Sequence, residues 1–234
     1  MINGRRILAV VPARGGSKGI KLKNLRKIGG IPMVARVGMI VKEIELIDRA
    51  VISTDHEEIA KVARESGLAV PFFRPPKLSG DIISDLEVLT HALQTMEEID
   101  NCQYDIIVML QPTSPLRTAK HVVDTINKLI DGNYDAVWTV SETDPKAHSL
   151  KQLTLLNDKL DYYDSDGAKI IARQQLKTLY HRNGIAYAIK RECLLEQKSI
   201  KGKRASALVI KEPVISIDTE MDIKLAEFFL SLEL

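Results

Sequence analysis

Apolar residues along this chain gather in short, nearly unbroken runs that are separated by longer amphipathic stretches. Four runs precede residue 141, and each is nearly continuous rather than alternating, which is typical of strands covered on both faces. They span residues 7–11, 50–54, 105–110 and 135–140. Further strands that resume the parallel pattern are predicted at 184–190, 206–210 and 214–218.

Between these runs, apolar residues recur at helical spacing. Helices are predicted from Pro32 through "MVARVGMIVKEIELI", in "HEEIAKVARESG", in "SDLEVLTHALQTMEEI" and in "TAKHVVDTINKLIDG". Gly67 and Gly132 are expected to end the second and fourth of these helices. The last predicted helix, "TEMDIKLAEFFLSLEL", carries an apolar stripe made of Met221, Leu225, Phe228 and Phe229. Strands alternating with helices predict an α/β fold with a doubly wound, mostly parallel sheet.

The alternation fails between residues 141 and 183. This stretch is polar and contains Pro, Asp, Asn and Gly turn signals. We therefore interpret it as an insertion in a single domain of residues 1–234, with three alternatives: a lid, a small β-subdomain or an oligomerisation arm.

Composition restricts the classes of function. A chain of 234 residues, 45% hydrophobic and 27% charged, suits one soluble α/β domain. Its net charge of +2 does not favour nucleic acid or membrane as a partner, so any preference for anions must be local. Cys102 and Cys193 are too few and too far apart for a disulfide framework or a Cys-rich metal site. Without an apolar stretch of membrane-spanning length, we expect a cytoplasmic protein.

One basic loop follows the first apolar run, at "PARGGSKGIKLKN". It is not a Walker P-loop, because Lys18 precedes Gly19 and no hydroxyl residue follows. The spacing of Gly15, Gly16 and Gly19 also departs from the dinucleotide fingerprint. Gly15 and Gly16 would let backbone N–H groups approach an anion, while Arg14, Lys18, Lys21 and Lys23 add positive charge. On composition alone, an anion site and a solvated basic turn stay equally open.

The order of six segments decides between these readings. "PARGGSKGIKLKN", "VISTDHEEIAKVA", "FRPPKLSGD", "LQPTSPLR", "RNGIAYAI" and "ISIDTEMD" follow one another between residues 7 and 222. Together they resemble the CMP-sialic acid synthetases (acylneuraminate cytidylyltransferases). The resemblance implies a nucleotide-diphospho-sugar transferase-like fold and a Mg²⁺-dependent reaction of CTP with a nonulosonic (sialic-type) acid, giving the CMP-sugar and diphosphate. It also implies a homodimer in which a small subdomain is exchanged, which would explain residues 141–183.

The resemblance also implies which residues bind the nucleotide: Arg14, Gly15, Gly16, Ser17, Lys18, Lys23, Asn24, Arg74 and Ser84. Arg14 and Lys23 would offset the charge that grows as diphosphate leaves. Asn24 could orient a phosphate oxygen or the attacking hydroxyl, or it could cap a turn. Arg74 matches the segment on the cytosine and ribose side, although a surface arginine packed on Phe72 or Phe73 is the alternative. Asp81 and Ser84 could equally cap the next helix.

The sugar-binding residues implied by the resemblance are Gln111, Thr113, Ser114, Lys151, Arg173, His181, Asn183 and Tyr187. Many sugar nucleotidyltransferases have a metal-binding Asp at the position where this chain has Gln111. The ketodeoxyoctonate (KDO) type resembles Q-G-D in this segment, so the sequence here argues against that type. Arg173 would face the sugar carboxylate, and His181 with Arg182 could share that work. For Tyr187, ordinary strand packing is equally possible. Arg117 is expected to be structural.

Asp218 is the candidate metal ligand, since it ends an apolar run just before the last helix. Many members of the family have a D-x-D pair here, whereas this chain has Ser216 at the first position. Asp222 is expected to serve the last helix. The candidate catalytic set is Arg14, Lys23, Asn24, Gln111 and Asp218, and no general base stands out. A KDO-type enzyme and a non-catalytic nucleotide-binding relative remain the alternatives, and sialic, legionaminic and pseudaminic acids all remain candidate acceptors.

Overall fold

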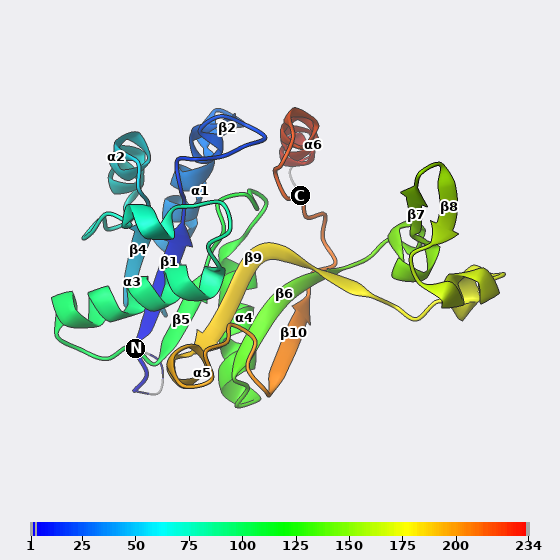
Figure 1. The fold of residues 1–234 in the computed structure, drawn as a ribbon. Helices are drawn as coiled ribbons and strands as arrows, with labels where there is room; N and C mark the ends of the chain where they lie inside the picture. The colour runs from blue at the N-terminus through cyan, green and yellow to red at the C-terminus, as the bar shows by residue number, and fades with distance from the viewer. Residues whose placement is uncertain (1, 3, 233–234) are drawn as a thin grey trace.

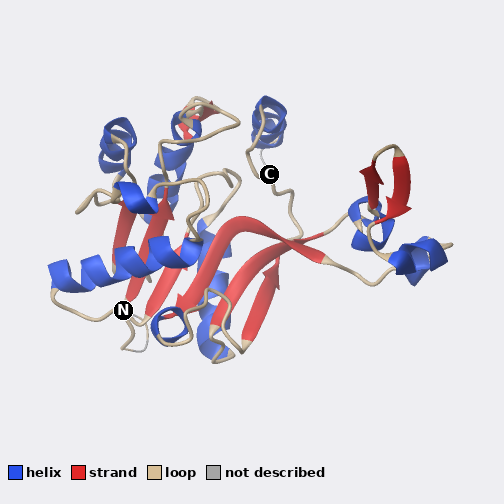
Figure 2. Cartoon of the chain, in the orientation of Figure 1, coloured by secondary structure: helices blue, strands red, loops and turns tan. Residues whose placement is uncertain are grey.

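A computed structural model describes residues 2 and 4–232. Its main sheet has six strands in the order β10-β6-β9-β5-β1-β4, with helices on both faces (Figures 1 and 2). These strands are β1 (Ile7–Pro12), β4 (Arg49–Ser53), β5 (Ile106–Met109), β6 (Ala136–Glu142), β9 (Tyr180–Lys190) and β10 (Ala205–Val209). The helices are α1 (Met33–Val41), α2 (Glu57–Ser66), α3 (Asp85–Asp100), α4 (Ala119–Asp131), α5 (Arg191–Leu195) and α6 (Glu220–Ser231). The predicted α/β fold with a mostly parallel sheet is therefore confirmed.

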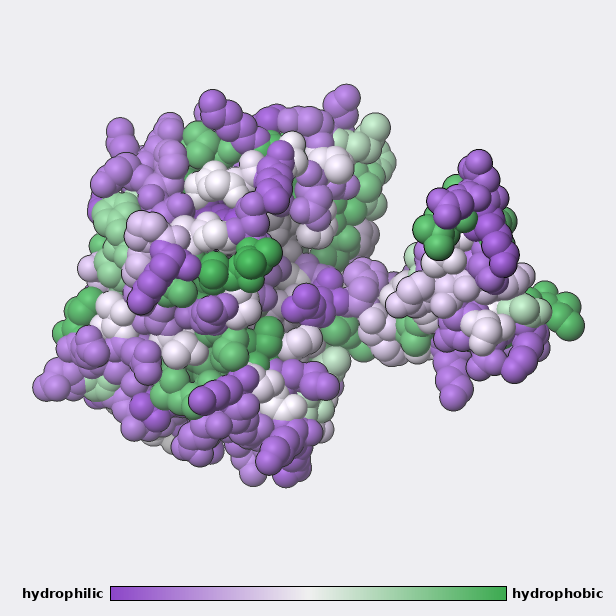
Figure 3. Space-filling view, viewed as in Figure 1, coloured by the Kyte–Doolittle hydropathy of each residue, from purple (hydrophilic) through white to green (hydrophobic). Residues whose placement is uncertain are grey.

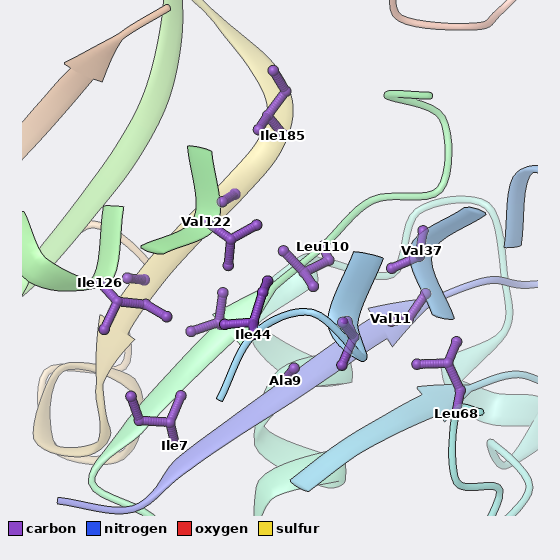
Figure 4. Packing of buried hydrophobic residues seen from close by; sticks show 14 of the residues in the cluster. Ile7, Ala9, Val11, Val37, Ile44, Leu68, Leu110, Val122, Ile126 and Ile185 are labelled. Atoms are coloured by element: carbon purple, nitrogen blue, oxygen red, sulfur yellow. The ribbon is translucent and has the colours of Figure 1, made fainter. Parts of the chain in front are cut away.

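The core lies in two layers because both faces of the central strands are buried. In β1, Ile7, Ala9 and Val11 pack toward α1, α2 and α4 (Figure 4). Leu8 and Val10 face the other way and pack toward α3 and α5. A strand covered on both faces needs apolar side chains at successive positions, which explains the unbroken apolar runs. No helix in the described part of the chain is long and apolar enough to cross a membrane.

Two of the strand predictions were wrong. β9 does not continue the parallel pattern, since it pairs antiparallel with both β5 and β6. Residues 143–179 leave the end of β6 and lead back into β9 at the same end of the sheet, where Glu142 pairs with Tyr180. β9 therefore runs in the direction opposite to β6. Residues 214–218 form no strand: Ile217 donates one backbone hydrogen bond to the carbonyl of Thr113, and the segment is otherwise irregular.

Most helices match their predicted positions. Gly67 ends α2 with φ of 100°, and Gly132 follows α4, as expected. α1 begins after Pro32 and ends at Val41, short of the predicted end of its apolar pattern.

The apolar stripe noted in the sequence of α6 is not the face that the fold buries. Met221 and Phe228 are 68% and 55% exposed, whereas Ile223 and Ala226 are buried against Ile20, Ile28 and Ile217. The face of α6 that is buried is the one that packs against the segment containing Ile20 and Ile28. Helical spacing in the sequence does not predict where that segment lies.

Residues 143–179 extend away from the main body (Figures 1 and 3). We call them the arm. The arm contains the hairpin of β7 (Leu153–Leu156) and β8 (Lys159–Tyr162), joined to short 3₁₀ turns. A second small hairpin, β2 (Lys27–Ile28) with β3 (Ile31–Pro32), follows the basic loop on the body.

Arg117 connects the turn that follows β5 to the middle of β9. It is buried, and its guanidinium donates to the carbonyls of Ile185 (2.5 Å), Gln111 (2.6 Å) and Gly184 (3.0 Å). Burial lowers the pKa of Arg117 to about 9. The expectation that Arg117 is structural is confirmed.

Replacing Arg117 with Met should destabilise the fold, because three carbonyl oxygens inside the protein each lose a charged hydrogen-bond donor. We expect the free energy of unfolding, measured by urea denaturation, to fall by about 2 to 4 kcal/mol. Lys120→Met is the control, since Lys120 is exposed and forms a surface ion pair with Asp124 on the same helix. Equal stability of the two variants would contradict the structural role of Arg117.

Candidate active site

A cavity of about 580 Å³ opens at the carboxyl ends of β1 and β5. Four segments form its walls: the basic loop after β1, residues 74–88, the turn after β5, and the segment before α6. Predicted site residues on these walls are Arg14, Ser17, Lys18, Lys23, Asn24, Arg74, Gln111, Thr113 and Asp218. The sheet edge where parallel strands end is where open α/β folds bind their ligands.

The basic loop is held by a hydrogen bond within it and by apolar packing against the body. The side-chain amide of Asn24 is buried and donates to the carbonyl of Arg14 at 3.0 Å, which closes the loop on itself. Ile20 packs into the apolar cluster beneath α6 that also contains Ile217. The loop and the segment carrying Asp218 are therefore packed on one apolar base, and their charged groups face the same cavity.

Gly15 has a different role from the one that the sequence predicted. Its N–H already donates to the Asp55 carboxylate at 2.8 Å, so in this conformation it does not point at a ligand. A Cβ at this position would lie 2.8 Å from the ring of His56, which explains the need for glycine. Neither Gly15 nor Gly16 lines the cavity.

Three cations of the loop are paired with carboxylates from distant segments. Arg14 and Lys18 both contact Asp81, at 2.8 and 2.7 Å, and Lys23 contacts Asp218 at 2.8 Å. The hydrogen bond from Lys18, together with that from Arg14, lowers the pKa of Asp81 below its usual value. Asp81 is thus a partner of the loop cations and does not cap the next helix.

Arg74 is buried and forms part of the cavity wall. Its guanidinium donates to the side chain of Ser53 at 2.9 Å and to the Ser53 carbonyl at 2.6 Å. Burial lowers its pKa to about 10, and the nearby carboxylate of Asp55 opposes that shift. The alternative of an exposed arginine packed on Phe72 or Phe73 is therefore wrong.

Asp85 is a cavity residue that the sequence reasoning missed. It is the first residue of α3, and it lines the same cavity as Arg74 and Gln111. Its neighbour Ser84 caps α3 through a reciprocal capping box with Glu87 and does not line the cavity. The only sequence signal for Asp85 was its place four residues after the family-like "FRPPKLSGD" segment, at the start of a predicted helix, where an acidic residue is common in any protein.

Asp218 presents its carboxylate at the cavity edge, where the side chain is 73% exposed. Its backbone N–H donates to Asp222, which also accepts from the N–H and hydroxyl of Thr219. Asp222 therefore caps α6, as predicted, and holds the backbone of Asp218 in place. Ser216 lies on the same wall. Within residues 2 and 4–232, no cluster of three or more His, Cys, Asp or Glu could hold a metal ion without help from a ligand.

Three predicted sugar-binding residues use their polar groups inside the protein. Asn183 accepts from Thr139 at 2.6 Å and donates to Ser141 at 3.1 Å. Ser114 donates to the Asn183 carbonyl at 2.7 Å. The hydroxyl of Tyr187 accepts from the N–H of Gly184, and its ring packs against Trp138 with centroids 5.3 Å apart. Tyr187 therefore packs within the sheet, which was the alternative to a role in sugar binding.

The remaining predicted sugar residues lie on the arm or at its base. Lys151 and Arg173 belong to the arm, and His181 contacts Thr143 where the arm joins the body. None of the three lines the cavity of its own chain.

Comparison with known proteins agrees with this geometry. A family model described as cytidylyltransferase matches residues 8–232. The chain is 32% identical to post-translational flagellin modification protein B of Campylobacter coli over 96% of this chain and 94% of the relative. It is also 32% identical to the CMP-N,N'-diacetyllegionaminic acid synthase of Campylobacter jejuni, over 97% and 96% of the two chains.

A solved structure of a CMP:2-keto-3-deoxy-manno-octonic acid synthetase complexed with CTP has the same fold. It aligns with a TM-score of 0.69 and 17% identity, covering 98% of this chain and 100% of the other. The family model, the relatives of equal length and the motifs along the chain agree, and the chain belongs to the cytidylyltransferase family, in the group of the CMP-sialic acid synthetases.

Proposed function

We propose that this enzyme transfers CMP from CTP to the anomeric hydroxyl of a sialic-type nonulosonic acid and depends on Mg²⁺. The observation that carries the proposal is the set of three loop cations, Arg14, Lys18 and Lys23, on the wall of one cavity. Each is paired with a carboxylate that is at least partly exposed, and a triphosphate can replace such a partner. The C. jejuni relative is named for a nonulosonic acid, which supports the same class of acceptor.

The reaction requires one bond to form and one to break at the α-phosphorus. The anomeric oxygen attacks this phosphorus, and the bond to the α,β-bridging oxygen breaks, so that diphosphate leaves with the bonding electron pair. Arg14 and Lys23, both on the cavity wall, would offset the negative charge that grows on the leaving group. The proton of the attacking hydroxyl passes to water or to a phosphate oxygen.

The residues at Asp218 fit a magnesium ion that is shared with the substrate. Mg²⁺ commonly takes only one or two protein carboxylates, while phosphates and water supply the remaining ligands. Asp218 would provide the carboxylate, and Ser216 on the same wall could hold a water ligand. When bound, the ion would neutralise charge on the triphosphate oxygens.

The acceptor is expected to lie beside Gln111, at the end of β5. Gln111 lines the cavity, and a side-chain amide can donate to or accept from a sugar hydroxyl. The backbone of Gln111 is fixed, since its carbonyl accepts from Arg117 and from the N–H of Ser114. A neutral amide here does not repel a sugar carboxylate as an Asp would.

We further propose a homodimer in which the arm of one subunit reaches the cavity of the other. The arm hairpin exposes apolar side chains that no other described part of the chain covers: Leu155, Leu156 and Leu160 are 67%, 74% and 63% exposed. Large exposed apolar patches are typical of protein interfaces. The exchange would also bring Lys151 and Arg173 to a sugar site, as the family resemblance implies.

The first prediction concerns activity. Purified protein with CTP, Mg²⁺ and a sialic, legionaminic or pseudaminic acid should release diphosphate, measured with a coupled phosphate assay. KDO is the comparison acceptor and should be turned over less efficiently. Binding of CTP without turnover of any acid would contradict the proposal and support a non-catalytic relative, while a preference for KDO would reassign the acceptor.

The second prediction is that Asp218→Asn lowers kcat by at least about 100-fold, because the carboxylate for the metal is lost. Circular dichroism and thermal unfolding should match those of the unmodified protein, since the side chain is exposed. Asp124→Asn, at an exposed ion pair on α4, is the control and should keep full activity. Activity of Asp218→Asn close to that of the control would place the metal ligand elsewhere.

The third prediction is a dimer by analytical ultracentrifugation. The double variant Leu155→Asp/Leu160→Asp should sediment as a monomer, because two charges would have to be buried at the interface. Ile99→Asp, at a 50% exposed position on α3, should leave the dimer intact. A monomeric unmodified protein with full activity would rule out exchange of the arm.

A further inference from the structure

Asp85 is a carboxyl group on the cavity wall with no role in holding the loop cations. Burial raises its pKa above the usual value, and the guanidinium groups of Arg182 and Arg74 partly oppose this shift. Within residues 2 and 4–232, its carboxylate has no hydrogen bond, and neither arginine comes within the 4.0 Å of an ion pair. A partly desolvated carboxylate without a donor is costly, so a ligand that supplies a donor would be favoured there.

The two arginines near Asp85 are each held in place by other groups. Arg74 is bound to Ser53 through Nε and one terminal nitrogen. The guanidinium of Arg182 lies over the ring of Trp138, at 5.4 Å from its centroid. Since these contacts fix both cations at a distance from Asp85, the carboxylate stays open to the cavity and does not collapse into an ion pair.

The position of Asp85 in the fold points to the acceptor rather than to the triphosphate. Asp85 interacts electrostatically with Arg182 and Tyr187, which are both on β9. The triphosphate cations come instead from the loop after β1 and pair with Asp81 and Asp218. A carboxylate near the phosphates that, unlike Asp81 and Asp218, has no cation paired with it would repel them, whereas the same group near a polyhydroxylated sugar can accept a hydrogen bond.

We propose that Asp85 is a specificity-determining residue of the acceptor pocket, where its carboxylate accepts a hydrogen bond from a hydroxyl or amide N–H of the sugar acid. This proposal rests on the function proposed above and adds a residue to it. Because a site built to accept a hydrogen bond discriminates against ligands that lack the donor, Asp85 would favour acceptors with an O–H or N–H at that position.

The amino group of cytosine is the competing donor, since carboxylates also accept from it. The two possibilities differ in which Michaelis constant responds. Loss of a contact with the acceptor raises KM for the sugar acid alone, whereas loss of a contact with the base raises KM for CTP and weakens the selection against UTP.

The test compares Asp85→Asn and Asp85→Ser with Glu98→Gln, an exposed carboxylate on the same helix. Steady-state kinetics would be measured with the best acid of the panel, varying CTP, UTP and the acid in turn. We expect kcat/KM for the acid to fall about 10- to 100-fold in both Asp85 variants, with KM for CTP within about twofold. Glu98→Gln should match the unmodified enzyme, and circular dichroism should be the same for all.

Each remaining outcome overturns the proposal in a distinct way. An unchanged KM for the acid in folded Asp85 variants would exclude Asp85 from the acceptor pocket. A raised KM for CTP, with UTP accepted more readily, would assign Asp85 to the base. If the unmodified enzyme turns over no acid at all, the proposed function itself fails, and this inference fails with it. Since Ser is well tolerated at helix N-termini, the second variant guards against misfolding.

Discussion

The balance of charge around the cavity is the constraint on which the site depends. Arg14, Lys18 and Lys23 share one wall, and like charges this close repel one another unless carboxylates or a ligand lie between them. The protein supplies Asp81 and Asp218 for this purpose. These partners are exposed, so each pair contributes little to stability and is readily exchanged for a stronger anion. The same pairs that offset repulsion among the loop cations without nucleotide would give way to a triphosphate, as proposed above.

This balance requires segments from opposite ends of the chain to meet. Lys23 and Asp218 are 195 residues apart in sequence and are joined at 2.8 Å. The apolar cluster of Ile20, Ile217 and Ile223 holds the two segments together beneath the charged groups. The hydrogen bond from Ile217 to the carbonyl of Thr113 adds the turn after β5 to the same frame. Burial therefore fixes the positions, and the charges determine what the cavity can bind.

Much of the fold and part of the site could be predicted from the sequence. The central strands were found because burial on both faces demands unbroken apolar runs, and α2 was found because Gly67 ends a clear helical pattern. The direction of β9 could not be found in this way, because the side chains of a strand alternate identically in parallel and antiparallel pairs. The exposed stripe of α6 and the open carboxyl of Asp85 depend on tertiary neighbours, which no local pattern encodes.

The most direct test of the central claim is a crystal structure of the protein with CTP and Mg²⁺. The account predicts that triphosphate oxygens lie within hydrogen-bonding distance of Arg14, Lys18 and Lys23, and that Asp81 has moved away from Arg14 and Lys18. A triphosphate bound outside this cavity, or a cavity whose cations keep their pairs with Asp81 while CTP is bound, would contradict it.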